Sequence, residues 1–184
     1  PPQTLAYNLD AAPAGATIAQ YGDTVTYTIT PNAGYFIADV HVDTVSVGPV
    51  GSYAFNGVTA NHLIEATFSL SQYTIVASAG FGGTISPSGA VGASHGDTRS
   101  FTMTPDPGYH LDSVRVDGVN VGAPPTYSFT NITASHAIAA YYSINVYSIA
   151  AAAGAGGGIS PSGIVPVAHG ADQAFTITPA TGYF

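Results

Sequence analysis

The chain has 184 residues, a formal net charge of −8 and only 7% charged residues, while its 46% of hydrophobic residues suffices for a folded core. With two arginines and no lysine it cannot neutralise a row of phosphates, so we expect no nucleic-acid partner and no binding to anionic lipid. The lack of cysteine excludes disulfides and thiolate chemistry, and the lack of lysine excludes Schiff bases. Cohesion must come from packing and backbone hydrogen bonds.

The N-terminal segment combines prolines with a short alternating pattern. It begins with Pro1-Pro2-Gln3 rather than Met, which is typical of a processed chain or a fragment. Apolar and polar residues then alternate, as on a strand with one buried face, at Thr4, Leu5, Ala6, Tyr7, Asn8 and Leu9. This segment departs most from the repeat described next. Residues 3–10 are therefore a candidate donor strand that pairs with another copy of the chain.

Internal repetition is the dominant feature of the sequence. The pattern Thr-Pro-x-x-Gly-Tyr occurs three times, and its glycines are 74 residues apart (108 − 34 = 74 and 182 − 108 = 74). Further glycines, prolines, aromatic residues and histidines keep this spacing, which indicates tandem duplication. The residues that define the repeat at this turn are Pro31, Gly34, Tyr35, Pro105, Gly108, Tyr109, Pro179, Gly182 and Tyr183.

The chain can be divided into repeat units in two ways, which differ in the phase of the repeat. One phase gives units at residues 1–74 and 75–148 and a partial unit at 149–184. The alternative phase gives a partial unit at 1–36 and units at 37–110 and 111–184. The half-unit has two explanations: the chain is a window cut from a longer array, or a neighbouring copy supplies the missing strands. The sequence is compatible with both.

Within each unit the hydrophobic periodicity is two. Threonines alternate with apolar residues over 24–30, and turn signals such as Asp117-Gly118 interrupt such runs at short intervals. No segment has the pattern of a capped amphipathic helix. We predict an all-β fold of tandem, small antiparallel β-sandwich units of Ig-like architecture. The uncharged run 137–155 is predicted to be two short strands that meet at a repeat boundary, not a membrane span.

The titratable residues do not form a dense constellation. His41 lies between Asp39 and Asp43, and on a regular strand the three would share one face, but the group is not repeated. His62 and His136 recur once per unit, which favours a role in a turn or at a strand edge over a metal ligand. We therefore expect a protein that is not an enzyme and that uses no metal and no cofactor.

The second unit carries a pattern that resembles a known family. The residues are Tyr73-Thr74-Ile75, Gly82-Gly83-Thr84-Ile85-Ser86-Pro87-Ser88-Gly89, Gly96-Asp97, Phe101-Thr102-Met103-Thr104-Pro105, Gly108-Tyr109 and Ile138-Ala139-Ala140-Tyr141-Tyr142. This pattern is similar to the divergent internalin-B-type "bacterial repeat" family, and the resemblance covers nearly the whole chain. The chain departs from it late in each unit, where many members carry Gly-Trp and this chain has no Trp.

The resemblance implies a tandem module of a large extracellular or cell-surface protein, acting as stalk, spacer or adhesion array. We expect a non-enzymatic structural protein, a subunit of a stalk or pilus-like filament whose copies associate head to tail through β-strand complementation. The alternative is a carbohydrate-binding or adhesin repeat module, with a glycan as partner. Asn131-Ile132-Thr133 is a glycosylation sequon, which makes Asn131 a candidate for modification.

Overall fold

The computed structural model describes residues 4–7 and 17–184, and every regular element in them is a β-strand. The predicted all-β class is therefore confirmed. None of the described residues forms a helix that could cross a membrane. The chain divides into two compact units, which are residues 1–73 with 92–98 and 130–134, and residues 74–91 with 99–129 and 135–184.

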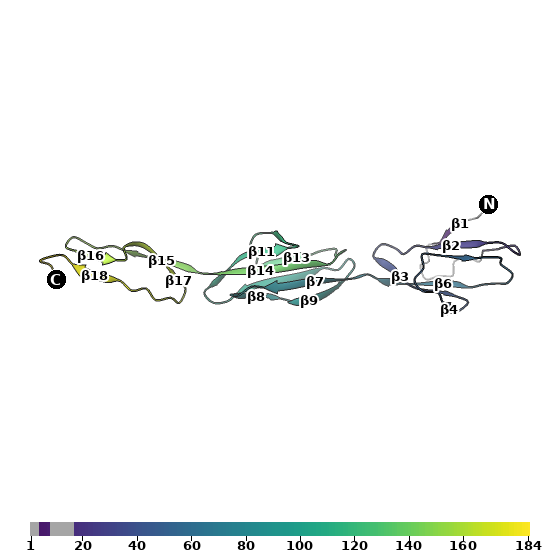
Figure 1. Ribbon diagram of the computed structural model, residues 1–184, viewed down its shortest axis with the longest axis horizontal. Helices are drawn as coiled ribbons and strands as arrows, with labels where there is room; N and C mark the ends of the chain where they lie inside the picture. The colour runs from purple at the N-terminus through teal and green to yellow at the C-terminus, as the bar shows by residue number, and fades with distance from the viewer. Residues whose placement is uncertain (1–3, 8–16) are drawn as a thin grey trace. The chain divides into compact units, whose positions relative to one another are not determined.

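The first unit contains two three-stranded sheets, with the orders β1-β2-β5 and β4-β3-β6 (Figure 1). Their strands are β1 (Thr4–Tyr7), β2 (Val25–Ile29), β3 (Tyr35–Val42), β4 (Val45–Ser46), β5 (Ser52–Phe55) and β6 (Ile64–Leu70). β1 runs parallel to β2, and the other pairs are antiparallel. Ile29, Val40 and Val42 are buried and form the centre of this unit.

Strands β7 to β14 form a larger module with a five-stranded sheet, β12-β11-β14-β7-β9, and a three-stranded sheet, β13-β10-β8 (Figure 1). The strands are β7 (Gln72–Ala79), β8 (Gly83–Ser86), β9 (Gly89–Ser94), β10 (Arg99–Pro105), β11 (Tyr109–Val116), β12 (Val119–Asn120), β13 (Thr126–Phe129) and β14 (His136–Ile144). Both sheets contribute buried apolar side chains, which is consistent with a small β-sandwich.

The predicted alternation of apolar and polar residues holds in the strands of this module. Phe101 and Met103 of β10 are buried, while their neighbours Ser100, Thr102 and Thr104 are exposed. β11 continues the pattern near its end, with buried valines on either side of an exposed arginine. One face of β10 and one face of β11 therefore supply the core, as half-buried antiparallel strands require.

Strands β15 (Val146–Ala151), β16 (Gly157–Ser160), β17 (Gly163–Ala168) and β18 (Thr176–Pro179) form a partial module. It has two two-stranded antiparallel sheets, β15-β17 and β16-β18. Because β14 ends at Ile144 and β15 begins at Val146, the prediction of two strands in the run 137–155 is confirmed. The division into repeats at 1–74, 75–148 and 149–184 stays a prediction.

Candidate assembly interface

The predicted donor strand coincides in part with β1. Residues Thr4–Tyr7 pair in parallel with β2 of the same chain, with Thr4 opposite Thr26 and Tyr7 opposite Ile29. Asn8 and Leu9 lie outside the described residues. The segment therefore adds a strand to the edge of a sheet, within one chain in this structure. Pairing of this strand between copies stays a prediction.

The Thr-Pro-x-x-Gly-Tyr motif forms the same turn each time. Gly34, Gly108 and Gly182 have φ values of 83°, 85° and 87°, in the left-handed region that favours glycine. Pro105 and Pro179 end β10 and β18, and Tyr35 and Tyr109 begin β3 and β11. The motif thus turns the chain at a strand end.

In the first unit, the motif glycine Gly34 packs against His95, a histidine from the next repeat. The N–H of Ser71 donates to the carbonyl of Gly34 at 2.7 Å, and the N–H of His95 donates to the carbonyl of Ser71 at 2.9 Å. A Cβ on Gly34 would overlap the His95 imidazole. The Tyr73 ring lies 6.2 Å from the same imidazole, centroid to centroid. Two backbone hydrogen bonds and a ring contact therefore fix this joint.

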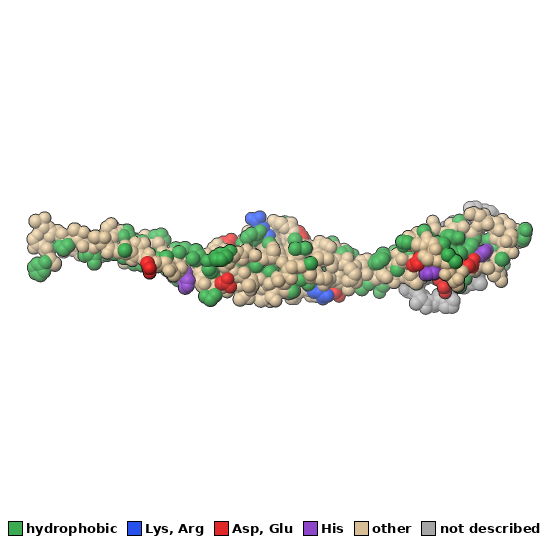
Figure 2. Space-filling view, turned by 60° about the horizontal axis from the view of Figure 1, so that its bottom comes forward, with side chains coloured by type: hydrophobic (Ala, Val, Ile, Leu, Met, Phe, Trp, Pro, Cys, Tyr) green, Lys and Arg blue, Asp and Glu red, His purple; other side chains and the backbone are tan. Residues whose placement is uncertain are grey.

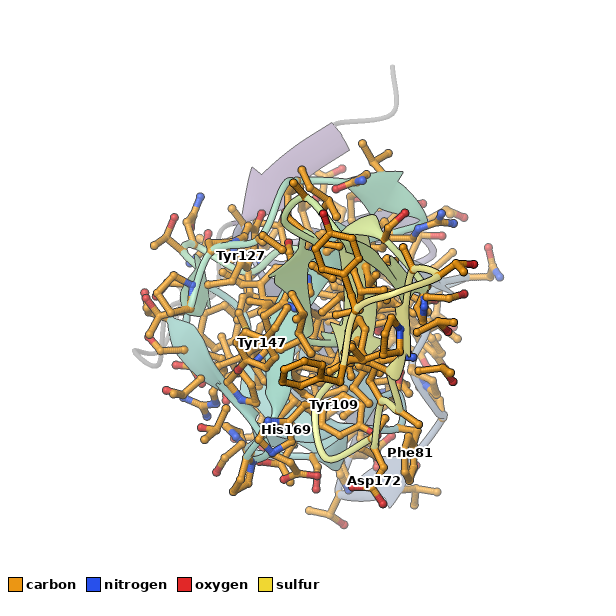
Figure 3. The ribbon with its side chains drawn as sticks, turned by 90° about the vertical axis from the view of Figure 1, so that its left-hand side faces the viewer. Phe81, Tyr109, Tyr127, Tyr147, His169 and Asp172 are labelled. Atoms are coloured by element: carbon orange, nitrogen blue, oxygen red, sulfur yellow. The ribbon has the colours of Figure 1, made fainter. Side chains whose placement is uncertain are left out.

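The same joint recurs in the second unit, 74 residues further on (Figure 3). The N–H of Asn145 donates to the carbonyl of Gly108 at 2.8 Å, and the N–H of His169 donates to the carbonyl of Asn145, also at 2.8 Å. A Cβ on Gly108 would overlap the His169 ring, which lies 6.1 Å from the ring of Tyr147. The sequence analysis did not assign a role to His95 and His169, although their spacing of 74 residues (169 − 95 = 74) marks them as repeat positions.

The repeated histidines 62 and 136 form a second recurring contact. The Nδ1 atoms of His62 and His136 lie 2.7 Å from carboxylate oxygens of Asp43 and Asp117, respectively. Each imidazole also stacks on a phenylalanine ring, at centroid distances of 4.9 and 4.8 Å. These histidines therefore hold a turn and a strand edge, which is the role that their recurrence favoured.

Asp43 and Asp117 sit in the turns after β3 and β11. The second carboxylate oxygen of Asp117 accepts the N–H of Ala137 at 2.8 Å, and that of Asp43 accepts the N–H of Leu63 at 2.9 Å. The hydrogen bond from the Ala137 N–H, followed by that with His136, lowers the pKa of Asp117. The hydrogen bond with His62, followed by that from the Leu63 N–H, lowers the pKa of Asp43. Both carboxylate oxygens of each aspartate thus make structural contacts.

The predicted common face for Asp39, His41 and Asp43 is wrong. β3 ends at Val42, and Asp43 has φ 49° in the turn, so its side chain leaves the strand and pairs with His62 instead. His41 Nε2 lies 3.6 Å from an oxygen of Asp39, whose pKa is lowered chiefly by the hydroxyl of Ser46. The described residues hold no group of three or more His, Asp or Glu side chains that could bind a metal ion.

The surface offers few charges to a partner. On the face shown in Figure 2, charged side chains are scattered among hydrophobic and uncharged polar ones. Arg115, which is exposed, lies over the ring of Tyr141 at 5.6 Å. The sequon residue Asn131 is exposed and has φ 50°, a conformation that asparagine tolerates better than most residues.

Residues 73–146 match the family model described as the divergent InlB B-repeat domain. This segment is similar to that family. The match begins within β7 and ends at the first residue of β15. The family resemblance expected from the sequence is confirmed for these residues. Comparison of the chain with curated proteins and with solved structures gives no match.

The matched segment contains the Asp117–His136 contact and the glycine of the joint. Gly108, Asp117 and His136 all lie within the matched residues, whereas His169, which packs on Gly108, lies beyond them. The joint therefore connects the InlB B-repeat domain to the partial module that follows, within one compact unit. The match indicates a repeat module at these residues.

Proposed function

We propose that the chain is a non-enzymatic, extracellular structural module whose copies associate head to tail into a stalk or pilus-like filament through β-strand pairing. The observation that carries this proposal is the joint made twice with the same atoms, by Gly34 with His95 and by Gly108 with His169. This joint consists of backbone hydrogen bonds and an imidazole ring packed against a glycine. It therefore repeats the same geometry from one module to the next. Such repetition is what a tandem stalk requires.

Strand pairing between copies is the finer part of the proposal. The β1 strand supports it, because a short N-terminal segment already adds in parallel to the edge of β2. The same addition made to another copy would link chains head to tail. The low charge of the surface also supports close approach, since few ion pairs would have to be desolvated.

The test is electron microscopy of the purified 184-residue chain across a concentration series, with a variant that blocks β1. Ala6→Pro removes a backbone N–H within β1, and we expect it to abolish filaments while the modules stay folded by circular dichroism. Ala12→Pro, six residues further along the chain, is the matched control and should assemble as the unchanged chain does. Filaments formed equally by Ala6→Pro would show that β1 is not the assembling strand.

A carbohydrate-binding or adhesin module is the second candidate. It is supported by Phe81, which is 87% exposed and packs edge-on against Tyr109 with ring centroids 5.6 Å apart. An exposed aromatic face of this kind can stack on a sugar ring. This candidate predicts binding on a glycan array by protein that stays monodisperse, which is the opposite of the result expected for a filament subunit.

A further inference from the structure

A short connection follows β5 in the first unit and β13 in the matched segment, residues 73–146, and both connections end at an anchored residue. Val58 accepts a hydrogen bond from the N–H of Gly22 at 2.8 Å and donates one to the carbonyl of Asp23 at 2.9 Å. Ile132, which lies 74 residues further on, makes the two equivalent bonds at 2.8 and 3.0 Å. In both places, two residues span the gap between the strand end and the anchor.

The second residue of this gap has a left-handed backbone conformation. Gly57 has φ 64° in the first unit, and its counterpart Asn131 has φ 50° in the matched segment. Glycine and asparagine adopt this conformation more readily than other residues do. The residue before it is Asn56 in the first unit and Thr130 in the matched segment. The first unit therefore has an Asn-Gly pair where the matched segment has Thr-Asn.

An Asn-Gly pair can react with itself. The backbone nitrogen of the glycine loses its proton to a base in solvent and bonds to the side-chain Cγ of the asparagine. The Cγ–Nδ2 bond then breaks, and the nitrogen leaves as ammonia with a proton taken from solvent. Water opens the resulting cyclic succinimide at one of its two carbonyls, which leaves aspartate or isoaspartate. Proximity within the pair and the absence of a side chain on the glycine favour the attack.

The fold leaves Asn56 and Gly57 accessible to this reaction. Both residues are exposed. The Asn56 side chain makes no hydrogen bond within residues 4–7 and 17–184, which the structure describes, so no such bond there holds its amide away from the backbone nitrogen. A Cβ at Gly57 would meet no atom within 4 Å, so water and base can reach the peptide bond that reacts.

The Asp-Gly pair of the chain, Asp117-Gly118, is held by the fold instead. Such a pair can form the same succinimide, with water as the leaving group. The carboxylate of Asp117, however, contacts Nδ1 of His136 at 2.7 Å and accepts the N–H of Ala137 at 2.8 Å. These contacts lower the pKa of Asp117, so the group stays ionised, and an ionised carboxylate is a poor target for a nucleophile. The sequence contains two reactive pairs, and the structure selects one.

We propose that Asn56 is a site of spontaneous deamidation in the folded chain, through attack by the backbone nitrogen of Gly57. The product carries a carboxylate, so the net charge changes from −8 to −9 (−8 − 1 = −9). Isoaspartate also adds one methylene group to the main chain between Phe55, which pairs with Val25, and the anchor Val58. Because both ends of the gap are fixed, the longer connection weakens the hydrogen bonds of the anchor. The inference does not depend on the proposed self-association.

Peptide mapping by mass spectrometry, with fragmentation that distinguishes isoaspartate from aspartate, tests the site in the 184-residue chain. The chain is aged at neutral and at mildly alkaline pH, both folded and in urea. In the folded chain we expect conversion at Asn56 to exceed that at Asn131 many-fold and to rise with pH, because the attacking nitrogen must lose its proton. Asp117 should isomerise in urea only. An Asn56 that reacts in urea and stays intact in the folded chain would overturn the inference, as would an Asp117 that isomerises equally in both.

Matched variants exchange the pair between the two connections. Gly57→Asn copies Asn131, keeps a residue that tolerates the left-handed conformation, and should slow the reaction several-fold. Thr130→Asn combined with Asn131→Gly transfers the pair to the matched segment and should create a second site there. Circular dichroism checks that each variant is folded. Unchanged conversion of Asn56 in the Gly57→Asn variant would overturn the assignment of the attacking nitrogen.

Amide hydrogen exchange of the aged chain tests the structural consequence. Exchange at Val58 should become faster in the isoaspartate fraction, while exchange at Ile132, its counterpart in the matched segment, should stay unchanged. Asn56→Thr, which copies the matched segment and cannot deamidate, should show no change at either position after the same ageing. Equal exchange at Val58 before and after conversion would refute the proposed weakening of the anchor.

Discussion

The turn between β3 and β4 contains a residue that its backbone conformation disfavours. Thr44 has φ 69°, and Gly118 occupies the equivalent position between β11 and β12 with φ 82°. In both turns the preceding aspartate has φ 49°, and the strand residues on either side of the two-residue loop are paired. The hairpins are thus matched, and Thr44→Gly and Gly118→Thr exchange one residue type between them.

The expected effect of Thr44→Gly follows from two opposing terms. The left-handed conformation costs an L-residue about 1–2 kcal/mol. For a β-branched residue such as threonine, the cost is toward the upper end of this range. Glycine offsets about 0.4–1 kcal/mol of that gain through its greater freedom in the unfolded chain. We expect Thr44→Gly to raise the free energy of unfolding of the first unit by about 1 kcal/mol, and Gly118→Thr to lower that of the second module by a similar amount.

Thermal unfolding of the 184-residue chain by circular dichroism measures these changes. A change of 1 kcal/mol in a unit of this size corresponds to a shift in Tm of about 4–8 °C. Amide hydrogen exchange at Val45 and Val119 assigns each shift to its hairpin. Thr24→Gly, at an exposed threonine outside β2 without a left-handed φ, controls for loss of the side chain alone. An unchanged or lower Tm for Thr44→Gly would refute the reasoning.

Two further predictions concern the joint and the aspartates. Gly108 and Gly122 share φ 85°, but only a Cβ on Gly108 would meet a neighbouring ring. Gly108→Ala should therefore destabilise the chain by about 1 kcal/mol more than Gly122→Ala in denaturant unfolding; equal losses would mean that the His169 contact carries no energy. The pKa values of Asp43 and Asp117 are lowered in the folded chain from 3.8, so their stabilisation is present above about pH 4 and is lost as the pH falls through the lowered values. Stability measured from pH 6 to 2 should decline below about pH 4, and Asp117→Asn should flatten the decline; a flat profile for the unchanged chain would contradict this.

The local features of the fold were predictable from particular residues. Alternation over residues 24–30 predicted one buried face of β2, where Ile29 is buried and Thr26 is exposed. The Asp117-Gly118 pair predicted a turn where the structure has a two-residue hairpin. The spacing of the motif glycines predicted tandem units, and the central one matches the InlB B-repeat domain. These features are local because side-chain periodicity and left-handed φ depend on neighbours in sequence.

The recurring contacts were only partly predictable. The Thr-Pro-x-x-Gly-Tyr motif identified Gly34 and Gly108 as repeat positions. Their partners His95 and His169 come from the following repeat, 61 residues away (95 − 34 = 61 and 169 − 108 = 61). The assignment of Asp43 to the face of β3 failed because a left-handed residue ends the strand one position earlier than the pattern indicated. Spacing can mark a position as repeated, yet it does not say which other position it touches.

The sequence by itself determined the repeat, the all-β class and the buried face of strands such as β10. Only the tertiary structure decided which strand edges are paired: β7 covers β14, while β1 pairs with β2 and leaves β6 at the edge of its sheet. The physical reason is that a sheet ladder is made of backbone N–H and C=O groups, which every residue except proline carries alike. Side-chain pattern therefore selects the face of a strand, and three-dimensional packing selects its neighbours.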